Sequence, residues 1–225
     1  MLLLTACSNW RRNVGASDKT NEQLSAEVDQ LRRELDVSRR IAAIFLTADD
    51  EDMYAEVLSV ILEVTESKYG VFGYINEDGD LVCPSMTRNI WDQCQVPDKN
   101  IVFPHDTWGG IWGRSMDEKK PLFENRAFTV PQGHISVARA LNAPIVHKDQ
   151  LIGNLLVGNK PTDYDKNDMR MLESIAEHIA PVLKARLQRN AQQHHRNAAE
   201  NQLQRIHGAV HAGIVLQSAD SSIIH

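Results

Sequence analysis

Residues 130–168 read VPQGHISVARALNAPIVHKDQLIGNLLVGNKPTDYDKND, and this stretch decides the fold. Two apolar segments, Arg139–His147 and Leu151–Gly158, are separated by a short polar turn. Strand-length apolar segments on either side of such a turn predict a β-hairpin. The second segment is apolar on both faces, which predicts a strand in the middle of a sheet. Gly153 and Gly158 leave room for a close approach to its backbone.

Composition excludes several classes of function. A chain of 225 residues with 42% hydrophobic residues can hold one good-sized core. Its net charge of −6 argues against a nucleic-acid surface, which needs a basic face. No apolar run reaches the roughly 18 residues of a membrane span. Cys7, Cys83 and Cys94 lack metal-ligand or redox spacing, so we expect a cytoplasmic protein.

The N-terminus, residues 1–19, is predicted to be disordered. Leu4-Thr5-Ala6-Cys7 resembles the lipidation box of bacterial lipoproteins. A working signal also needs a basic start and a longer apolar stretch, and both are missing here. A lipid anchor through Cys7 is therefore the minor alternative to a cytoplasmic location.

Residues 20–48 follow a heptad pattern. Steps of four and three residues alternate between the apolar positions, and Glu and Arg flank them. This pattern predicts a coiled-coil helix that brings two copies together in parallel. One amphipathic helix packed on its own domain is the alternative. The heptad positions are Leu24, Val28, Leu31, Leu35, Ser38, Ala42 and Phe45.

A second helix and a first hairpin follow. The helix is predicted over Asp52–Lys68 and ends near Gly70, a residue type that favours the left-handed conformation of a C-cap. Val71–Ile75 and Leu81–Met86 are predicted to pair as strands around a polar turn.

Residues 87–126 are less regular and rich in aromatic residues. Ile101–Phe103 and Pro121–Phe123 are predicted to be short strands. Thr107 is expected to cap a helix over Trp108–Lys119, which its glycines weaken.

A long helix is predicted after residue 168. We expect Pro181 to kink it, because proline removes a backbone donor. Residues 188–208 continue it as a polar linker or partner-paired signalling helix. Residues 209–217 are predicted to form the first strand of another domain, cut off at residue 225. The helix carries an apolar stripe of Met171, Leu172, Ile175, Ala176, Ile179, Val182 and Leu183.

This order of elements resembles a GAF domain, a sensory fold, over residues 50–187. The resemblance implies an α+β fold with about six antiparallel strands, long terminal helices on one face and a small-molecule pocket on the other. The chain looks like GAF modules of bacterial sensor histidine kinases and cyclic-dinucleotide enzymes. Residues 203–225 look similar to the opening of a PAS domain. The stretches that carry the resemblance are Trp108–Arg114, Pro131–His134, Ala143–Ile145, Ile152-Gly153, Gly158–Lys160 and Tyr164-Asp165.

The irregular middle would roof that pocket and supplies most of the candidate ligand-binding residues. Aromatic side chains could stack on a flat ligand while a basic side chain holds a charged group. The alternative is that the tryptophans fill the core and the arginines are solvated or paired with Glu118 and Glu124. The candidates are Trp91, Trp108, Trp112, Arg114, His134 and Arg139.

A second motif resembles the Asn-Lys…Phe…Asp-Glu signature of cyclic-nucleotide-binding GAF domains. Tyr164 stands in place of the Phe and Met169 in place of the Glu, so the motif does not support a cyclic nucleotide as ligand. The resemblance implies an ion pair of Lys160 with Asp168 that braces the hairpin against the last helix. The structural brace comprises Asn159, Lys160, Tyr164 and Asp168.

The cofactor stays unknown at this stage. A covalent bilin in related GAF domains uses a Cys followed by His, whereas Cys83 precedes Pro84 and Cys94 precedes Gln95. Haem needs an axial ligand, and the available histidines, His105, His134 and His147, are of a type that more often lies on the surface.

Three functional hypotheses remain. The first is a sensory module, a homodimer through both terminal helices that reports a small molecule to an output domain outside the chain. The second is a GAF dimerisation scaffold without ligand. The third is a thiol enzyme like the GAF-fold methionine sulfoxide reductases. That family's attacking cysteine precedes the Pro-Ile strand, and residues 123–145 contain no cysteine, so we expect no enzymatic activity.

Overall fold

The predicted hairpin consists of β5 (Ala140–His147) and β6 (Gln150–Gly158). Lys148 and Asp149 in the connection both have positive φ, at 48° and 63°. Two such residues match the twist of the flanking strands, as a type I′ turn does. β6 pairs with β5 on one side and with β1 (Tyr69–Ile75) on the other. The strand predicted for the middle of the sheet therefore has neighbours on both sides.

The computed structural model describes residues 20–86, 101–130 and 132–221, and its centre is a six-stranded antiparallel sheet. The strand order is β3-β2-β1-β6-β5-β4. The outer strands are β2 (Leu81–Met86), β3 (Val102–Phe103) and β4 (Leu122–Glu124). The predicted α+β fold with six antiparallel strands is confirmed.

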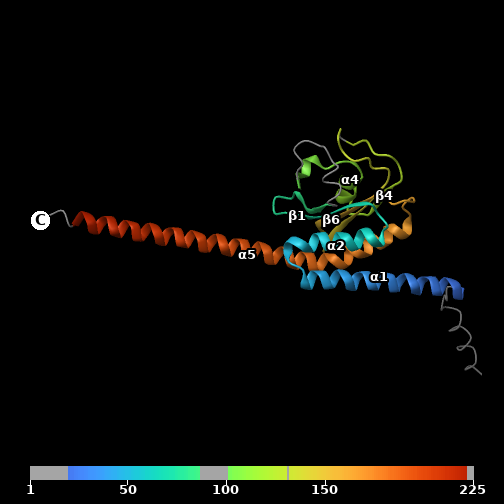
Figure 1. Cartoon of the computed structure of the whole chain (residues 1–225), viewed down its shortest axis with the longest axis horizontal. Helices are drawn as coiled ribbons and strands as arrows, with labels where there is room; N and C mark the ends of the chain where they lie inside the picture. Colours follow the sequence, from blue (N-terminus) through green and yellow to red (C-terminus); the bar gives the residue numbers. More distant parts are fainter. Residues whose placement is uncertain (1–19, 87–100, 131, 222–225) are drawn as a thin grey trace, which may run out of the picture.

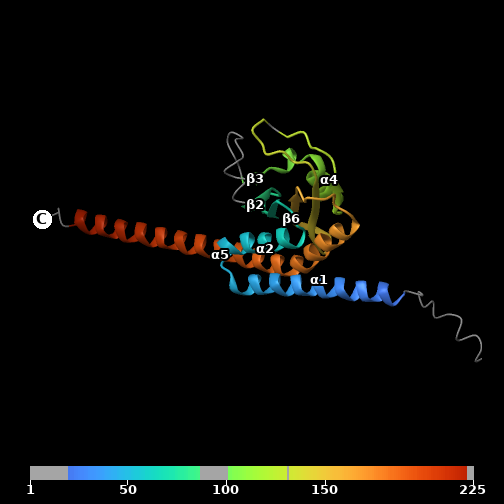
Figure 2. The same cartoon turned by 45° about the vertical axis from the view of Figure 1, so that its right-hand side comes forward.

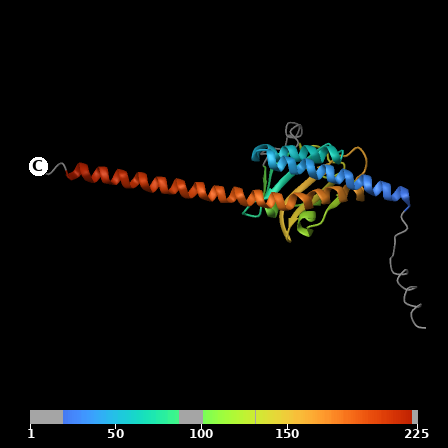
Figure 3. The same cartoon turned by 90° about the horizontal axis from the view of Figure 1, so that it is seen from below.

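Helices cover both faces of the sheet unequally (Figures 1 and 2). α2 (Asp50–Val64) and α5 (Lys166–Ser221) pack against one face, and α1 (Asn21–Thr47) lies over these two helices. The short helix α4 (Gly110–Glu118) contacts β4, β5 and β6 from the other face. α5 then leaves the domain and runs on alone (Figure 3).

The main core lies between the sheet and its helical layer. Leu155 of β6 and Leu141 of β5 are fully buried, as are Leu172, Ile179 and Leu183 on the predicted stripe of α5. At about 1.5–3 kcal/mol for each buried aliphatic side chain, this stripe holds the first part of α5 on the sheet.

Gly153 explains how α5 approaches the sheet so closely. A Cβ atom there would lie 2.7 Å from the Gly73 carbonyl oxygen and 3.2 Å from Leu183 Cδ2. The expected close approach is therefore real at Gly153. At Gly158 the nearest atom would be the Arg139 carbonyl oxygen at 3.4 Å, an ordinary contact.

The end of α2 differs from the prediction. The helix ends at Val64, and Gly70 lies inside β1 rather than at a cap. The left-handed residue is Glu66, with φ of 50°. The Ser67 amide donates to the Leu62 carbonyl at 3.0 Å, which closes a Schellman motif. In this structure a glutamate, Glu66, takes the left-handed conformation for which the sequence analysis expected a glycine, Gly70.

The start of α4 was also predicted wrongly. Its N-cap is Gly109, whereas Thr107 belongs to the short 3₁₀ segment His105–Thr107. The Thr107 hydroxyl donates to the Pro104 carbonyl at 2.6 Å. Thr107 lies two residues before the N-cap, so its side chain is not in the position that caps the helix.

The long helix departs from the prediction near its C-terminal end. α5 is continuous across Pro181, and its axis bends within the domain in Figures 1 and 2 before the helix runs on beyond it. Pro181 is exposed, and water can solvate the carbonyl that it leaves without a partner. Residues 209–217 are helical, so the predicted strand was wrong. Extending an existing helix costs less than starting another element. A PAS domain beyond this point stays a prediction.

Within residues 20–86, 101–130 and 132–221, no helix is long and apolar enough to span a membrane. The lipidation motif at Cys7 lies outside the described residues.

Candidate functional site

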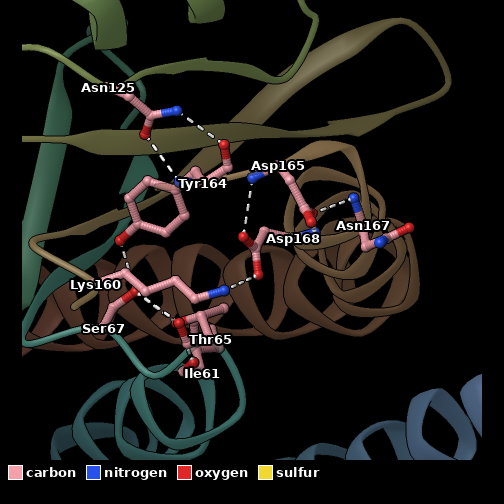
Figure 4. A network of polar contacts seen from close by, with 9 residues as sticks. All are labelled: Ile61, Thr65, Ser67, Asn125, Lys160, Tyr164, Asp165, Asn167 and Asp168. Carbon is pink, nitrogen blue, oxygen red and sulfur yellow. Dashed lines mark hydrogen bonds and ion pairs between the residues drawn. The ribbon is translucent and has the colours of Figure 1, made fainter. Parts of the chain in front are cut away.

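The ion pair implied for Lys160 and Asp168 is present where β6 leads into α5 (Figure 4). Lys160 Nζ donates to Asp168 Oδ1 at 2.7 Å, and the two side chains are only 15% and 14% exposed. The other carboxylate oxygen of Asp168 accepts from the Asp165 amide at 3.0 Å. The pair thus ties the end of the hairpin to the first turn of α5.

Asp165 caps the helix that this ion pair anchors. Its Oδ1 accepts from the amides of Asn167 at 2.7 Å and Asp168 at 3.0 Å. Together with the bond from the Asp165 amide to Asp168, this is a reciprocal capping arrangement. The same two amides lower the pKa of the Asp165 carboxyl. The position of the first turn of α5 is therefore fixed by side chains on both sides.

Tyr164 extends the network to α2 and β4 (Figure 4). Its hydroxyl pairs with Ser67 Oγ at 2.7 Å, and Ser67 Oγ accepts from the Thr65 hydroxyl at 2.9 Å. The side-chain amide of Asn125 bonds both backbone groups of Tyr164, at 2.8 and 2.9 Å. Burial raises the pKa of the Tyr164 hydroxyl, which keeps it protonated.

Asn159 and Arg139 hold the loop before β5 on the same junction. Asn159 has φ of 56°, and its Oδ1 accepts from the Ala138 amide at 2.8 Å. Arg139 donates to the Lys160 carbonyl at 2.7 Å and faces Asp163 with Nε at 3.3 Å. Arg139, predicted as a ligand contact, is thus occupied by groups of the junction.

Replacing Lys160 by Met tests this junction. The substitution leaves the buried Asp168 carboxylate without its cation, so we expect the free energy of unfolding to fall by about 2 kcal/mol. Urea denaturation measures the change. Lys166 is an exposed residue in the first turn of α5, the turn that contains Asp168. Lys166→Met should change the free energy of unfolding by less than about 0.5 kcal/mol. Equal effects of the two substitutions would contradict the brace.

The predicted aromatic roof forms a cluster of its own. Trp112 lies 5.9 Å from Phe103 and 6.2 Å from Trp108, measured between ring centroids. Trp108 Nε1 donates to the Phe103 carbonyl at 3.1 Å. The rings pack over Cys83 and Met116 in a second, smaller core. Trp91 lies outside the described residues.

The other two predicted ligand contacts do not join this cluster. Arg114 donates to Glu124 at 2.5 Å, and Glu124 also accepts from Arg126, so these bonds lower the pKa of Glu124. The ion pair of Arg114 with Glu124 is the alternative that the sequence left open. His134 is exposed on its loop, with Nδ1 2.8 Å from the Ile135 carbonyl.

Two buried asparagines were missed at the sequence level. Asn142 of β5 and Asn154 of β6 exchange two amide hydrogen bonds, at 2.8 and 2.9 Å, and are at most 1% exposed. Asn142 alternates with the core residues Leu141 and Ala143, so the pair lies on the α4 face. Amides within otherwise apolar strands were the available signal.

Arg186 was missed as well. It lies only 9% exposed on the buried side of α5 and donates to the carbonyls of Phe45 at 3.1 Å and Ala48 at 2.8 Å. Its Nε also donates to Asp50. One guanidinium thus joins the end of α1 and the start of α2 to α5. In the sequence, a basic residue three positions after Leu183 continues the apolar stripe, and this pattern could have indicated that Arg186 is buried.

Cys83, the cysteine that the structure describes, is a poor nucleophile. It is 2% exposed, and burial raises the pKa of its thiol to about 12. We expect a disulfide reagent such as DTNB at pH 8 to leave Cys83 unmodified in the folded chain and to modify it in urea, because the thiolate is the reactive form. Mass spectrometry of the labelled peptides reads the site. Rapid modification in the folded chain would contradict this environment.

The described residues hold no group of three or more His, Cys, Asp or Glu that could bind a metal ion. His105, one of the three candidate haem ligands, is exposed, and its ring lies tilted against Trp108 with centroids 4.5 Å apart. The identity of any cofactor stays open on this geometry.

Comparison with known proteins agrees with this architecture. The family model described as a GAF domain matches residues 47–184. A methyl sulfide methyltransferase-associated sensor from Methanosarcina acetivorans is 28% identical over 119 residues, which is 49% of this chain and 12% of that protein. The chain therefore matches only a small part of this relative's length.

Two solved structures share the fold at low sequence identity. The GAF domain of a Coxiella burnetii phosphoenolpyruvate-protein phosphotransferase aligns with a TM-score of 0.56 and 16% identity, over 70% of this chain and 96% of that one. The free methionine-R-sulfoxide reductase of Neisseria meningitidis aligns with a TM-score of 0.51 and 16% identity, over 70% and 91%. At this identity the likeness concerns the fold alone.

Proposed function

The chain belongs to the GAF domain family, and from that premise we propose that it is the sensory module of a signal-transduction protein such as a bacterial histidine kinase. It binds a small molecule and passes its state through α5 to an output domain outside this chain. The observation that carries the proposal is α5 itself. Its first part is buried on the sheet, and the same helix continues beyond the domain to Ser221.

The contacts of α5 make it suited to carry a signal. Its N-terminus is fixed by the Lys160–Asp168 junction, and twenty residues later Arg186 ties it to the ends of α1 and α2. A ligand that favours one packing of the sheet and helices over another would change the direction or position of the free helix. The similarity to a protein described as a sensor supports the same function.

We further propose that the module is a homodimer through α1 and α5. Val37, Ile41 and Phe45 of α1 are buried on the chain's own domain. The earlier heptad positions are exposed instead, and Val182 of α5 is 40% exposed beside a groove of about 240 Å³ between the two helices. A second copy would cover this apolar face. The exposed heptad positions are Leu24, Val28, Leu31 and Leu35.

A dimerisation scaffold without ligand is the second candidate. It is favoured by the roof, where Trp112 packs on both Phe103 and Trp108, and by the ion pairs of Arg114 and Arg139 with acidic residues. The thiol-enzyme reading loses support from the burial of Cys83. We therefore propose that the chain itself has no enzymatic activity.

Native mass spectrometry of the chain purified from cells, with an absorption spectrum, separates these candidates. The sensory module predicts a dimer that carries an additional small-molecule mass, or a visible chromophore. An empty dimer that no metabolite stabilises would support the scaffold and refute the sensor.

A further inference from the structure

A cavity of about 760 Å³ lies where α5 leaves the domain, on the side of the sheet away from the aromatic roof. The β1–β2 turn reaches beside the helix at this end (Figures 1 and 3). Ile152 and Leu187 contribute apolar surface, and Tyr54 of α2 and Tyr74 of β1 contribute aromatic surface. The volume falls within the range of about 300–1,000 Å³ that is usual for small-molecule sites.

Two tyrosine hydroxyls are the central feature of this cavity. The rings of Tyr54 and Tyr74 lie 5.7 Å apart, and both residues line the cavity. Tyr54 is only 7% exposed as a residue, and its ring packs on Phe72 and Tyr74. Arg139 Nε is the one fully buried side-chain nitrogen or oxygen atom without a hydrogen-bond partner among the described residues, so the Tyr54 hydroxyl, which has no partner among them either, is reached by solvent from the cavity. Such a hydroxyl is available to a ligand as a hydrogen-bond donor.

The charges around the cavity favour an anion. Asp50 is already engaged by Arg186 and Arg189, and Glu77 faces His195 at 3.7 Å. Lys184 donates to the neutral side chain of Gln150 at 3.0 Å and forms no ion pair with a carboxylate of the described residues. Two phenol donors and one cation without a carboxylate partner therefore remain on the walls. Burial and, to a smaller extent, the neighbouring Tyr74 and Asp50 raise the pKa of Tyr54, so its hydroxyl stays a donor.

We propose that this cavity is a second ligand site, which binds a small carboxylic acid with an aromatic or aliphatic body. The carboxylate accepts hydrogen bonds from Tyr54 and Tyr74 and lies near the Lys184 ammonium, while the body packs on the tyrosine rings and Leu187. Because α5 supplies one wall, an occupied site holds the helix against the β1–β2 turn. The site lies apart from the roof, so its failure would leave the proposed sensory function standing.

Benzoate is a suitable probe, with benzamide as its neutral counterpart and benzylamine as its cationic one. A ¹H–¹⁵N NMR titration of the 225-residue chain follows the amides of the β1–β2 turn and of α5. We expect saturable benzoate binding in the millimolar range, as suits a ligand of about nine non-hydrogen atoms. Benzamide should bind more weakly and benzylamine weakest. Absence of saturable benzoate binding, or tighter binding of benzylamine, would overturn the proposal.

Tyr54→Phe keeps the ring and removes only the donor. It should weaken benzoate binding about tenfold or more, the loss typical of one hydrogen bond to a charged group. Because the hydroxyl is unpaired in the free protein, the melting temperature should not fall. Tyr69→Phe, the same change on β1 outside the cavity lining, should leave benzoate binding unaltered. Equal benzoate affinity in wild type and Tyr54→Phe would refute the assigned contact.

Discussion

Arg186→Met should lower the free energy of unfolding by about 3 kcal/mol, the largest effect expected of a single substitution outside the apolar core. The side chain is 9% exposed, and methionine can fill most of its volume but cannot donate. The carbonyls of Phe45 and Ala48 would lose their bonds at the α1–α2 corner, and Asp50 would lose its closest cation. Urea denaturation followed by circular dichroism measures the change.

Arg189→Met is the matched control for this prediction. Arg189 also faces Asp50, at 3.5 Å, but its side chain is 68% exposed. An exposed ion pair is screened by water, so we expect a loss below about 0.5 kcal/mol. If both substitutions cost the same small amount, Arg186 would not be what joins α1 and α2 to α5.

Leu31→Asp should convert the dimer to a monomer. Leu31 is 58% exposed in the single chain, and in the proposed dimer it would meet its counterpart along the heptad face. Each copy then loses about 1.5–3 kcal/mol of apolar burial and gains a carboxylate at the interface. The dissociation constant of the dimer should rise by about 100-fold or more. Analytical ultracentrifugation over a concentration series measures it.

Ala26→Asp adds the same charge to α1 at an exposed position on the opposite side of the helix from the heptad face. This control should leave the dimer intact. A monomeric wild-type chain, or dissociation by both substitutions alike, would show that the exposed leucines do not form the dimer interface.

The regular parts of the fold were predictable because local patterns determine them. The apolar segments around Lys148 and Asp149 indicated the central hairpin, and the stripe from Leu172 to Leu183 indicated the face of α5 that is buried. The boundaries were less predictable. Glu66, rather than Gly70, takes the left-handed conformation after α2, because tertiary contacts can offset the strain of a non-glycine residue there.

The polar contacts of the candidate site divide in a similar way. The ion pair of Lys160 with Asp168 spans eight residues and belongs to a local motif, so the resemblance could imply it. Arg186 and Asp50 are 136 residues apart, and no pattern in the sequence connects them. The Asn142–Asn154 pair depends on the strand register, which fixes the amides only once β5 and β6 are aligned.

Arg114 and Arg139 were predicted as ligand contacts from their residue type alone. Arginines were assigned to a ligand because they are free to bind one in many proteins. Here Glu124 accepts from Arg114, and Asp163 faces Arg139. The sequence offered the pairing of Arg114 with Glu124 as the alternative, whereas the pairing of Arg139 with Asp163 becomes visible only in the folded structure.

A distance measurement between the two copies of α5 tests the central claim most directly. Gln202, exposed on the free part of the helix, is changed to Cys and spin-labelled after Cys7, Cys83 and Cys94 are replaced by alanine. The distance between the two spin labels is measured by pulsed electron paramagnetic resonance. One sample is the chain as purified, and the other has been unfolded and refolded to remove bound molecules. The sensory relay predicts an inter-copy distance that differs between the two samples. Identical distances, or none between copies, would contradict it.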